Sequence, residues 1–251
     1  MDSIVQRSVV AQLRRRPEVV ETGPFVLGWD PSTESKYISY ATPLPGAPIT
    51  AADVAGLVAA FRSVGRLPRL EYVVSSAPDL ERELLAAGFT VEARHDYLVC
   101  TSDSLAVPPV PEGFALVAPE SDDDIRGMIQ AQVEAFGDEF PVGDGDIARV
   151  RRTTSQGGVV IMARSRAGEP VGGGQASAPS AGLAEVGGIA VREPFRRRGL
   201  AGALTAEIAR RAFAGGVEAA WLEASGDDSW RVYERVGFVP TGKRLYISLE
   251  P

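Results

Sequence analysis

The 251-residue sequence has one cysteine, one histidine and only two lysines, Lys36 and Lys243. A lone Cys100 excludes a disulfide within the chain. With His95 as the only histidine, there are too few soft ligands for a structural zinc site, so no metal is expected. Nearly every positive charge is an arginine, which makes a cluster of arginines weaker evidence for a binding site here than in a lysine-rich protein.

Long apolar runs are missing as well. No stretch reaches the length of a membrane span, and residues 1–16 lack the apolar core and small-residue cleavage site of a secretory leader. We therefore expect a cytoplasmic, reducing location. The net charge of -7 does not favour a nucleic acid or an anionic membrane as a partner and better suits an amine substrate. The composition, with 45% hydrophobic and 24% charged residues, is typical of globular proteins.

Prolines mark a seam near the middle of the chain. Pro108, Pro109 and Pro111 cannot donate hydrogen bonds to a strand ladder, and they favour extended linker geometry. We therefore expect an N-terminal domain at 1–105, a linker at 106–111 and a second domain at 112–251.

The sequence of the second domain predicts a mixed α/β (α+β) fold. Leu200, Leu204 and Ile208 recur every four residues, which indicates a helix that ends at Gly215-Gly216. Apolar periodicity predicts the remaining elements. They are strands at 114–117, 159–164, 170–178, 183–191, 219–224 and 244–249 and helices at 123–136, 144–154 and 230–236.

The first domain repeats the last part of this order. Gly88-Phe89 matches Gly237-Phe238 at an offset of 237 − 88 = 149 residues. The same offset relates a strand at 71–76 to 220–225 and a helix at 51–61 to 200–210. Three elements in one register indicate a duplicated unit, so we expect a fold of two related halves.

The stretch Glu185–Thr205 is best suited to chemistry. It predicts a strand that leads through a turn rich in arginine and glycine into a helix. First-turn amides of a helix have no internal acceptor, and the helix dipole adds partial positive charge, so such a turn binds anions. Gly199, Ala201 and Gly202 leave the backbone accessible to a pyrophosphate, and Arg196–Arg198 add charge. A solvated basic turn is the alternative.

The same residues resemble the signature of the GNAT superfamily of N-acetyltransferases. That signature is Gln or Arg, two residues, Gly, one residue, and Gly or Ala, and the chain has Arg196-Arg197-Arg198-Gly199-Leu200-Ala201. The later segment WRVYERVGF, residues 230–238, is similar to the family's second signature. The resemblance covers about 112–251. It implies a mostly antiparallel central sheet flanked by helices, and transfer of an acetyl group from acetyl-CoA to an amine.

The resemblance also implies where acetyl-CoA binds. In the family, amides of the signature turn hold the pyrophosphate, which here means Arg196, Arg197, Arg198, Gly199, Leu200 and Ala201, with Gly202 adjacent. The backbone of Ile189, Ala190 and Val191 corresponds to the stretch that hydrogen-bonds the pantetheine arm, and an amide near Val191 is placed for the oxyanion. Gly187-Gly188 suits a bulge that parts the sheet for the thioester. Packing within the sheet is the alternative for these residues.

Tyr233 matches the family's tyrosine that protonates the leaving thiolate, a role suited to a phenol with a reference pKa of about 10. A core tyrosine is the other interpretation, and the asparagine often found seven residues earlier is Gly226 here. The attacking amine must be neutral, so a base is needed. Glu185, at a position that is often acidic in the family, is the first candidate and Glu223 is the second. An exposed or structural carboxylate explains either one equally well.

The repeat predicts that the first domain lacks this site. Subtracting 149 places Arg196–Ala201 on Ala47–Ala52, where charge and glycine are gone and Pro48 removes a backbone amide. Tyr233 falls on Leu84. We therefore expect a degenerate copy without a cofactor site, which covers the sheet edge of its partner and walls the substrate cleft.

Three functions are compatible with these features. The first is an enzyme that acylates an amine of a small molecule or peptide by direct attack on the acyl-CoA thioester. The second is a non-catalytic acyl-CoA sensor, and the third is a structural protein with two degenerate halves, which the intact turn disfavours. The loop Gly137–Asp146 usually shapes the acceptor site in relatives, and its Asp138, Glu139 and Asp144 either suit an amine or face solvent. Either a monomer or a homodimer is expected.

Overall fold

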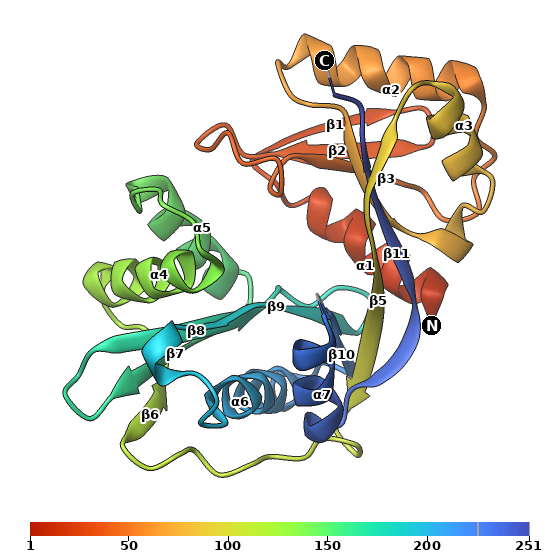
Figure 1. Cartoon of the computed structure of the whole chain (residues 1–251). Coiled ribbons are helices and arrows are strands. Elements are labelled where there is room, and N and C mark those ends of the chain that lie inside the picture. The colour runs from red at the N-terminus through yellow and green to blue at the C-terminus, as the bar shows by residue number, and fades with distance from the viewer. Residues whose placement is uncertain (225, 251) are drawn as a thin grey trace. The chain divides into compact units, whose positions relative to one another are not determined.

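The computed structural model describes residues 1–224 and 226–250 and divides into two compact units (Figure 1). The first unit contains Met1–Tyr97 and the end of the chain from Thr241, and the second contains Leu98–Pro240. Within the described residues, no helix combines the length and the apolar character that a bilayer crossing needs.

The first unit is built on a sheet with the strand order β1-β2-β3-β4-β11-β5. Its core lies between this sheet and helices α2 and α3, where Leu57, Phe61 and Leu84 pack with Leu70 and Tyr72 of β4. The elements in chain order are α1 (Asp2–Leu13), β1 (Glu18–Thr22), β2 (Phe25–Trp29), β3 (Tyr40–Pro43), α2 (Ala51–Ser63), β4 (Arg69–Val73), α3 (Leu80–Ala86), β5 (Thr90–Thr101) and, from the end of the chain, β11 (Val239–Ser248).

The second unit has the strand order β5-β10-β9-β8-β7-β6. Its other elements are β6 (Phe114–Val117), α4 (Asp122–Phe136), α5 (Asp144–Ser155), β7 (Val159–Ser165), β8 (Pro170–Ala176), β9 (Leu183–Val191), α6 (Leu200–Ala214), β10 (Ala219–Glu223) and α7 (Asp227–Val236). Strands β6 to β9 are antiparallel neighbours, whereas β10 runs parallel to β9. The mixed, mostly antiparallel sheet flanked by helices that the sequence predicts is confirmed.

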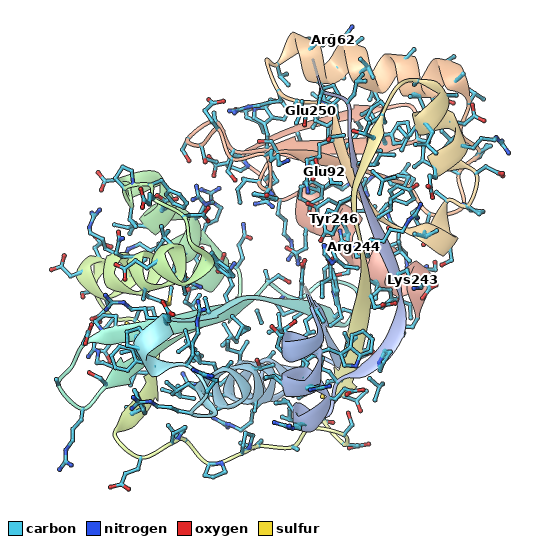
Figure 2. The ribbon with its side chains drawn as sticks, viewed as in Figure 1. Arg62, Glu92, Lys243, Arg244, Tyr246 and Glu250 are labelled. Atoms are coloured by element: carbon cyan, nitrogen blue, oxygen red, sulfur yellow. The ribbon has the colours of Figure 1, made fainter. Side chains whose placement is uncertain are left out.

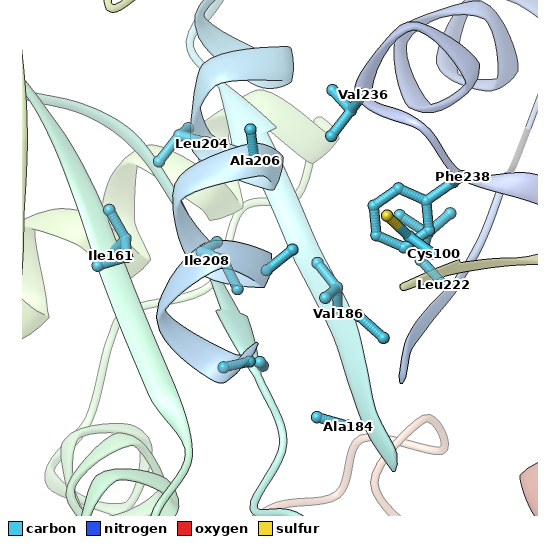
Figure 3. Close-up of a cluster of buried hydrophobic side chains, with 14 of the residues drawn as sticks. Cys100, Ile161, Ala184, Val186, Leu204, Ala206, Ile208, Leu222, Val236 and Phe238 are labelled. Atoms are coloured by element: carbon cyan, nitrogen blue, oxygen red, sulfur yellow. The ribbon is translucent and has the colours of Figure 1, made fainter. Parts of the chain in front are cut away.

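Helices cover both faces of this second sheet. On one face, Leu204 and Ile208 of α6 belong to a core that includes Ile161 of β7 (Figure 3). On the other face, Met128 of α4 packs with Met162, the next residue of the same strand. Because successive strand residues point to opposite faces, α4 and α6 lie on opposite sides of the sheet.

The two halves repeat a common order of elements. Helix α2 begins at Ala51 and α6 at Leu200, and strand β5 begins at Thr90 and β11 at Val239, each pair 149 residues apart (200 − 51 and 239 − 90). The same turn closes α3 and α7: the Phe89 amide donates to the carbonyl of Leu84 (3.0 Å), as the Phe238 amide does to that of Tyr233 (3.1 Å). The last strand is longer than predicted, because it begins at Val239, directly after this turn, rather than at residue 244.

The predicted offset is wrong for one strand. Leu70 and Tyr72 of β4 face the helices of their unit, as Ala220 and Leu222 of β10 do, so the offset there is 220 − 70 = 150. Alternate residues of a strand face opposite sides, and an error of one residue therefore exchanges inner and outer side chains. Glu71 consequently corresponds to Trp221 rather than to Ala220.

The compact units differ from the predicted domain boundaries of 1–105 and 112–251. Strand β11 pairs antiparallel with β4, from Arg244 opposite Val73 to Ser248 opposite Arg69, so the end of the second half belongs to the first unit. In turn, Cys100 of β5 packs in the core of the second unit. The end of each half thus falls in the compact unit of the other half, the segment from Thr241 in the first unit and residues 98–101 of β5 in the second.

A buried network of charges lies on β4, β5 and β11 of the first unit (Figure 2). Arg69 and Arg244, each 1% exposed, both donate to Glu71, from Nη1 at 2.5 Å and from Nη2 at 3.3 Å. Arg69 Nε also donates to both oxygens of Glu92 at 3.1 Å. The ring of Tyr246 lies 5.2 Å from the Arg69 Cζ and 5.6 Å from the Arg244 Cζ. The opposite charges of Arg69, Arg244 and Glu71 therefore compensate each other where water is excluded, and Glu92 pairs with Arg69 from the exposed side.

Candidate active site

A tight turn connects β9 to α6. After Val191 the chain forms a single helical turn at Glu193–Phe195, and Gly199 then caps α6 with a φ of 87°. Arg197 has a φ of 59°, in the same left-handed region, which is uncommon for a residue with a side chain. Glycine adopts this region without steric cost, so position 199 needs glycine for a backbone reason.

The first turn of α6 leaves its amides available. The amides of Leu200, Ala201 and Gly202 precede the first intrahelical bond, from the Ala203 amide to the Gly199 carbonyl (3.1 Å). Among the described residues, no side chain caps this helix and no acidic residue lies in its first turn. The positive end of the helix dipole is thus uncompensated, which fits the diphosphate of CoA.

Two other helices, α2 and α4, close their own amino ends with a side-chain cap. In α4, the Ser121 hydroxyl accepts from the Asp124 amide (3.1 Å), and a carboxylate oxygen of Asp124 accepts from the Ser121 amide (3.4 Å). Helix α2 has the same arrangement with Thr50 and Asp53. The open end of α6 therefore differs from the capped ends of α2 and α4.

Two of the three arginines in the turn contact their own protein. Arg196 donates through Nε to the carbonyl of Val191 (2.9 Å) and through Nη2 to the carbonyl of Ala135. Its backbone amide donates to the carbonyl of Glu193 (3.1 Å). The structure therefore places Arg196 apart from the other predicted phosphate-binding residues, because both its amide and its guanidinium already have acceptors.

Arg198 also contacts its own protein, whereas Arg197 does not. Arg198 donates to the carbonyl of Pro194 (3.2 Å) and lies over the rings of Phe114 and Phe195, 5.9 Å from each centroid. Arg197 is exposed and has no ion pair or side-chain hydrogen bond within the described residues. Arg197 is thus the cation of the turn that is most available to an anion.

Strands β9 and β10 part at their carboxyl ends. They pair from Leu183 opposite Ala219 to Glu185 opposite Trp221, and the pairing stops there although β9 continues to Val191. In the described part of the chain, the stretch 186–191, which includes the predicted pantetheine-binding residues Ile189, Ala190 and Val191, has no strand partner on the β10 side. An opening at the carboxyl ends of parallel strands is a common ligand position in open α/β sheets.

The predicted bulge in β9 is confirmed. Against β8, Ala190 pairs with Gly173 and Gly187 pairs with Gln175. Gly188 and Ile189 therefore face the single residue Gly174, and Gly188 has a φ of 66°. Such a bulge bends the strand and increases its local twist.

Helix α7 brings Tyr233 beside the amino end of α6. Val232 and Val236 of α7 lie 3.7 Å from the point where a Cβ of Gly202 would stand, so the two helices pack closely there. The Tyr233 ring is half-buried and lies 6.4 Å from that of Phe238. Burial raises the pKa of Tyr233 above its ordinary value of 10.0, so the phenol keeps its proton at neutral pH. Its hydroxyl has no hydrogen-bond partner within the described residues.

The two candidate bases lie on the face of the sheet opposite α6. Glu185 and Glu223 each stand between two residues of the core under α6. These are Ala184 and Val186 of β9 for Glu185, and Leu222 of β10 and the following Ala224 for Glu223. Alternation along each strand therefore turns both carboxylates to the other face. Glu185 belongs to the last residue pair before the strands part, and both side chains are partly exposed.

Sequence reasoning missed Gln132 of α4. Its Nε2 donates to the carbonyl of Gly188 at 2.7 Å and so supports the bulge from the α4 side. No pattern in the sequence marks this residue, because its partner is a backbone carbonyl that every amino acid supplies.

Comparison with known proteins agrees with this geometry. Residues 125–238 match the family model of the acetyltransferase (GNAT) family. A search of curated proteins gives no match. Among solved structures, the GCN5-related N-acetyltransferase from Kribbella flavida is 24% identical with a TM-score of 0.81, over 100% of this chain and 96% of that one.

Two further structures are similar along nearly the whole chain. The GCN5-related N-acetyltransferase from Sphaerobacter thermophilus is 18% identical with a TM-score of 0.67, over 100% of this chain and 92% of its own. A tandem GNAT protein from the clavulanic acid biosynthesis pathway is 16% identical with a TM-score of 0.62, over 98% and 88%. At these identities the structures show a shared fold. Together with the family match and the open turn before α6, they show that the chain carries an acetyltransferase domain of the GNAT family at residues 125–238.

Proposed function

We propose that the second half of the chain is an enzyme that transfers an acyl group, most simply acetyl, from acyl-CoA to an amine of a small molecule or peptide. Family membership supports acyl transfer from acyl-CoA in general. The observation that carries the finer proposal is the parting of β9 from β10 just before an uncapped α6. The amino end of α6 can bind a diphosphate, and the opening between β9 and β10 can hold the arm that carries the thioester.

The donor is held mainly by backbone groups in this proposal. The amides of Leu200, Ala201 and Gly202 bind the diphosphate together with the exposed Arg197. The open edge of β9 at 189–191 hydrogen-bonds the pantetheine arm as a neighbouring strand would. A polypeptide amide near Val191 then lies beside the acyl oxygen and stabilises negative charge on it.

Acyl transfer by direct attack needs an acid and a base. The amine nitrogen forms a C–N bond to the acyl carbon while the C–S bond breaks and its electron pair leaves with sulfur. Tyr233 is the proposed acid, which gives its phenolic proton to that thiolate and regains one from solvent. The raised pKa keeps Tyr233 protonated before the reaction.

The base removes a proton from the amine. Glu185 is the proposed base because it stands at the last strand pair before the opening. Glu223 is the second candidate, on the same face of the neighbouring strand. Alkylamines are mostly protonated at neutral pH, so a carboxylate that first accepts this proton, directly or through water, allows the attack.

The first half, residues 1–105, is proposed to be a related copy that binds no CoA. Its helix α2, equivalent to α6, begins with a capping box that uses its own first-turn amides. Pro48 also removes an amide just before that helix.

Two measurements test the proposed function. Titration with CoA in a calorimeter is expected to show one site per chain, and CoA is expected to raise the melting temperature because it binds the native state. Incubation with acetyl-CoA and a panel of primary amines is expected to release thiol and to give a product with the mass of the acetylated amine. Binding without thiol release for any amine would favour a sensor, and the absence of binding would overturn the donor site.

A further inference from the structure

The carboxyl end of α4 is tied to the strand and turn that lead into α6 by three successive contacts. Gln132 Nε2 donates to the Gly188 carbonyl at 2.7 Å, and Arg192 Nε pairs with Glu134 Oε2 at 2.7 Å. The third contact is from Arg196 Nη2 to the carbonyl of Ala135. The contacts follow the same order along both segments, so the last turns of α4 run beside the end of β9 and the turn after it.

Arg196 makes the last of these contacts with a geometry that only arginine provides. Its planar guanidinium donates from Nε to the carbonyl of Val191 (2.9 Å) and from Nη2 to that of Ala135. One rigid group thereby joins two segments of backbone. Ala135 lies in the last turn of α4, where backbone carbonyls receive no hydrogen bond from an amide of the same helix. Arg196 therefore also caps the end of the helix.

The segment held in this way exposes large apolar side chains. Phe136, the last residue of α4, is 61% exposed, and Phe140 in the following loop is 48% exposed. Gly137 between them has a φ of 81° and ends the helix in the left-handed region. Exposed aromatic residues next to a fixed helix end are suited to contact a ligand.

We propose that Arg196 is a positioning residue, which holds the carboxyl end of α4 and the loop after it for the acceptor and does not bind the donor phosphate. The first residue of the signature turn thus serves the acceptor side, and Arg197, with no side-chain partner in the described residues, serves the donor side. The part that concerns the acceptor rests on the proposed function. The part that concerns α4 depends only on the two carbonyl contacts.

The first test compares the variants Arg196→Ala, Arg196→Lys, Arg197→Ala and, as a matched control in the exposed β7–β8 turn, Arg166→Ala. The Kd for CoA is expected to change less than about twofold in Arg196→Ala and to rise about fivefold or more in Arg197→Ala, because one charged phosphate contact is lost only in the latter. The KM for the amine is expected to rise about tenfold in Arg196→Ala, with kcat changed less. Arg196→Lys is expected to recover part of this loss, since an ammonium group reaches a carbonyl but lacks the planar fork.

The second test needs no activity. The amides of Gly137 and Asp138 donate to the carbonyls of Glu134 and Val133 at the end of α4. Their hydrogen exchange in the free protein is expected to be about tenfold faster in Arg196→Ala than in the wild type. Arg166→Ala and Arg197→Ala are expected to leave it unchanged.

Two results would overturn the proposal. One is a loss of CoA affinity in Arg196→Ala as large as in Arg197→Ala, which would place the guanidinium on the phosphate. The other is unchanged exchange at Gly137 and Asp138 in Arg196→Ala. If the wild type binds no CoA, the proposed function fails by itself, whereas the exchange comparison still decides whether Arg196 holds α4.

Discussion

Thr50 and Asp53 close the amino end of α2 on itself. The Thr50 hydroxyl accepts from the Asp53 amide at 3.3 Å, and Asp53 Oδ2 accepts from the Thr50 amide at 2.8 Å. Adding 149 places these two residues on Gly199 and Gly202, at the open end of α6. The first half of the chain thus closes the amino end of α2 with its own carboxylate. The second half leaves the equivalent end of α6 open to an external anion.

Thr50→Ala is expected to destabilise the protein by about 1 kcal/mol, because the Asp53 amide loses its acceptor. Unfolding by denaturant measures this change, and Ser63→Ala at the opposite, exposed end of α2 is the control. The Kd for CoA should stay the same in both variants. A weaker affinity for CoA in Thr50→Ala would contradict the assignment of α2 as a closed copy.

Gly199→Ala is expected to weaken CoA binding about tenfold or more, because a side chain strains the left-handed φ and displaces the amides of the turn. Gly168→Ala is the matched control, since Gly168 has a φ of 86° and no atom within 4 Å of an added Cβ. Both variants should lose about 1–2 kcal/mol of stability, because an L side chain is strained in the left-handed region. Calorimetry distinguishes the two variants by their Kd for CoA. Equal affinities for CoA in both would contradict the role of the turn in binding.

Tyr233→Phe is expected to lower kcat by about 100-fold or more while the Kd for CoA stays unchanged, because only proton transfer to the thiolate is lost. Burial raises the pKa of Tyr233 above 10.0. Ionisation of this acid should therefore lower the wild-type activity only at a pH above the pKa of a free phenol. An undiminished kcat in Tyr233→Phe would remove the residue from the mechanism.

Glu92→Gln is expected to destabilise the protein by about 1 kcal/mol at neutral pH, because Arg69 loses one of its two charged partners and keeps Glu71. Burial raises the pKa of Glu92, but hydrogen bonds from Ser248 and Arg69 and the Arg69 charge outweigh it and leave the pKa below 4.5. Since the folded pKa is depressed, this stabilisation is complete above 4.5 and is lost as the pH falls through the folded value. The difference in unfolding free energy between wild type and Glu92→Gln should therefore shrink in acid. Glu18→Gln, on an exposed position of β1, is the control at neutral pH and should leave the unfolding free energy unchanged.

Local patterns were sufficient for most elements of the second half. The predicted bounds of the strands Phe114–Val117 and Leu183–Val191 are confirmed, and α6 ends at Ala214, directly before the predicted glycines. These elements depend on apolar periodicity and on glycine in the left-handed region, and both are properties of short segments.

Residues whose partners are distant in the chain could not be predicted. The unit in which the ends of β5 and β11 lie depends on which strand edge each one pairs with, and neither strand's own sequence specifies that edge. Arg196 fits the family signature equally well whether its side chain meets a phosphate or the carbonyl of Ala135, 61 residues away.

The sequence alone determined where a helix must start without a cap, because Gly199 and the absence of a first-turn acid are local and decide what the α6 amides can do. The tertiary structure alone decided that β9 leaves β10 after Glu185, that Gln132 supports the bulge and that Arg196 holds α4. The physical reason is that these contacts end on backbone groups. Every residue carries such groups, so only folding selects which of them meet.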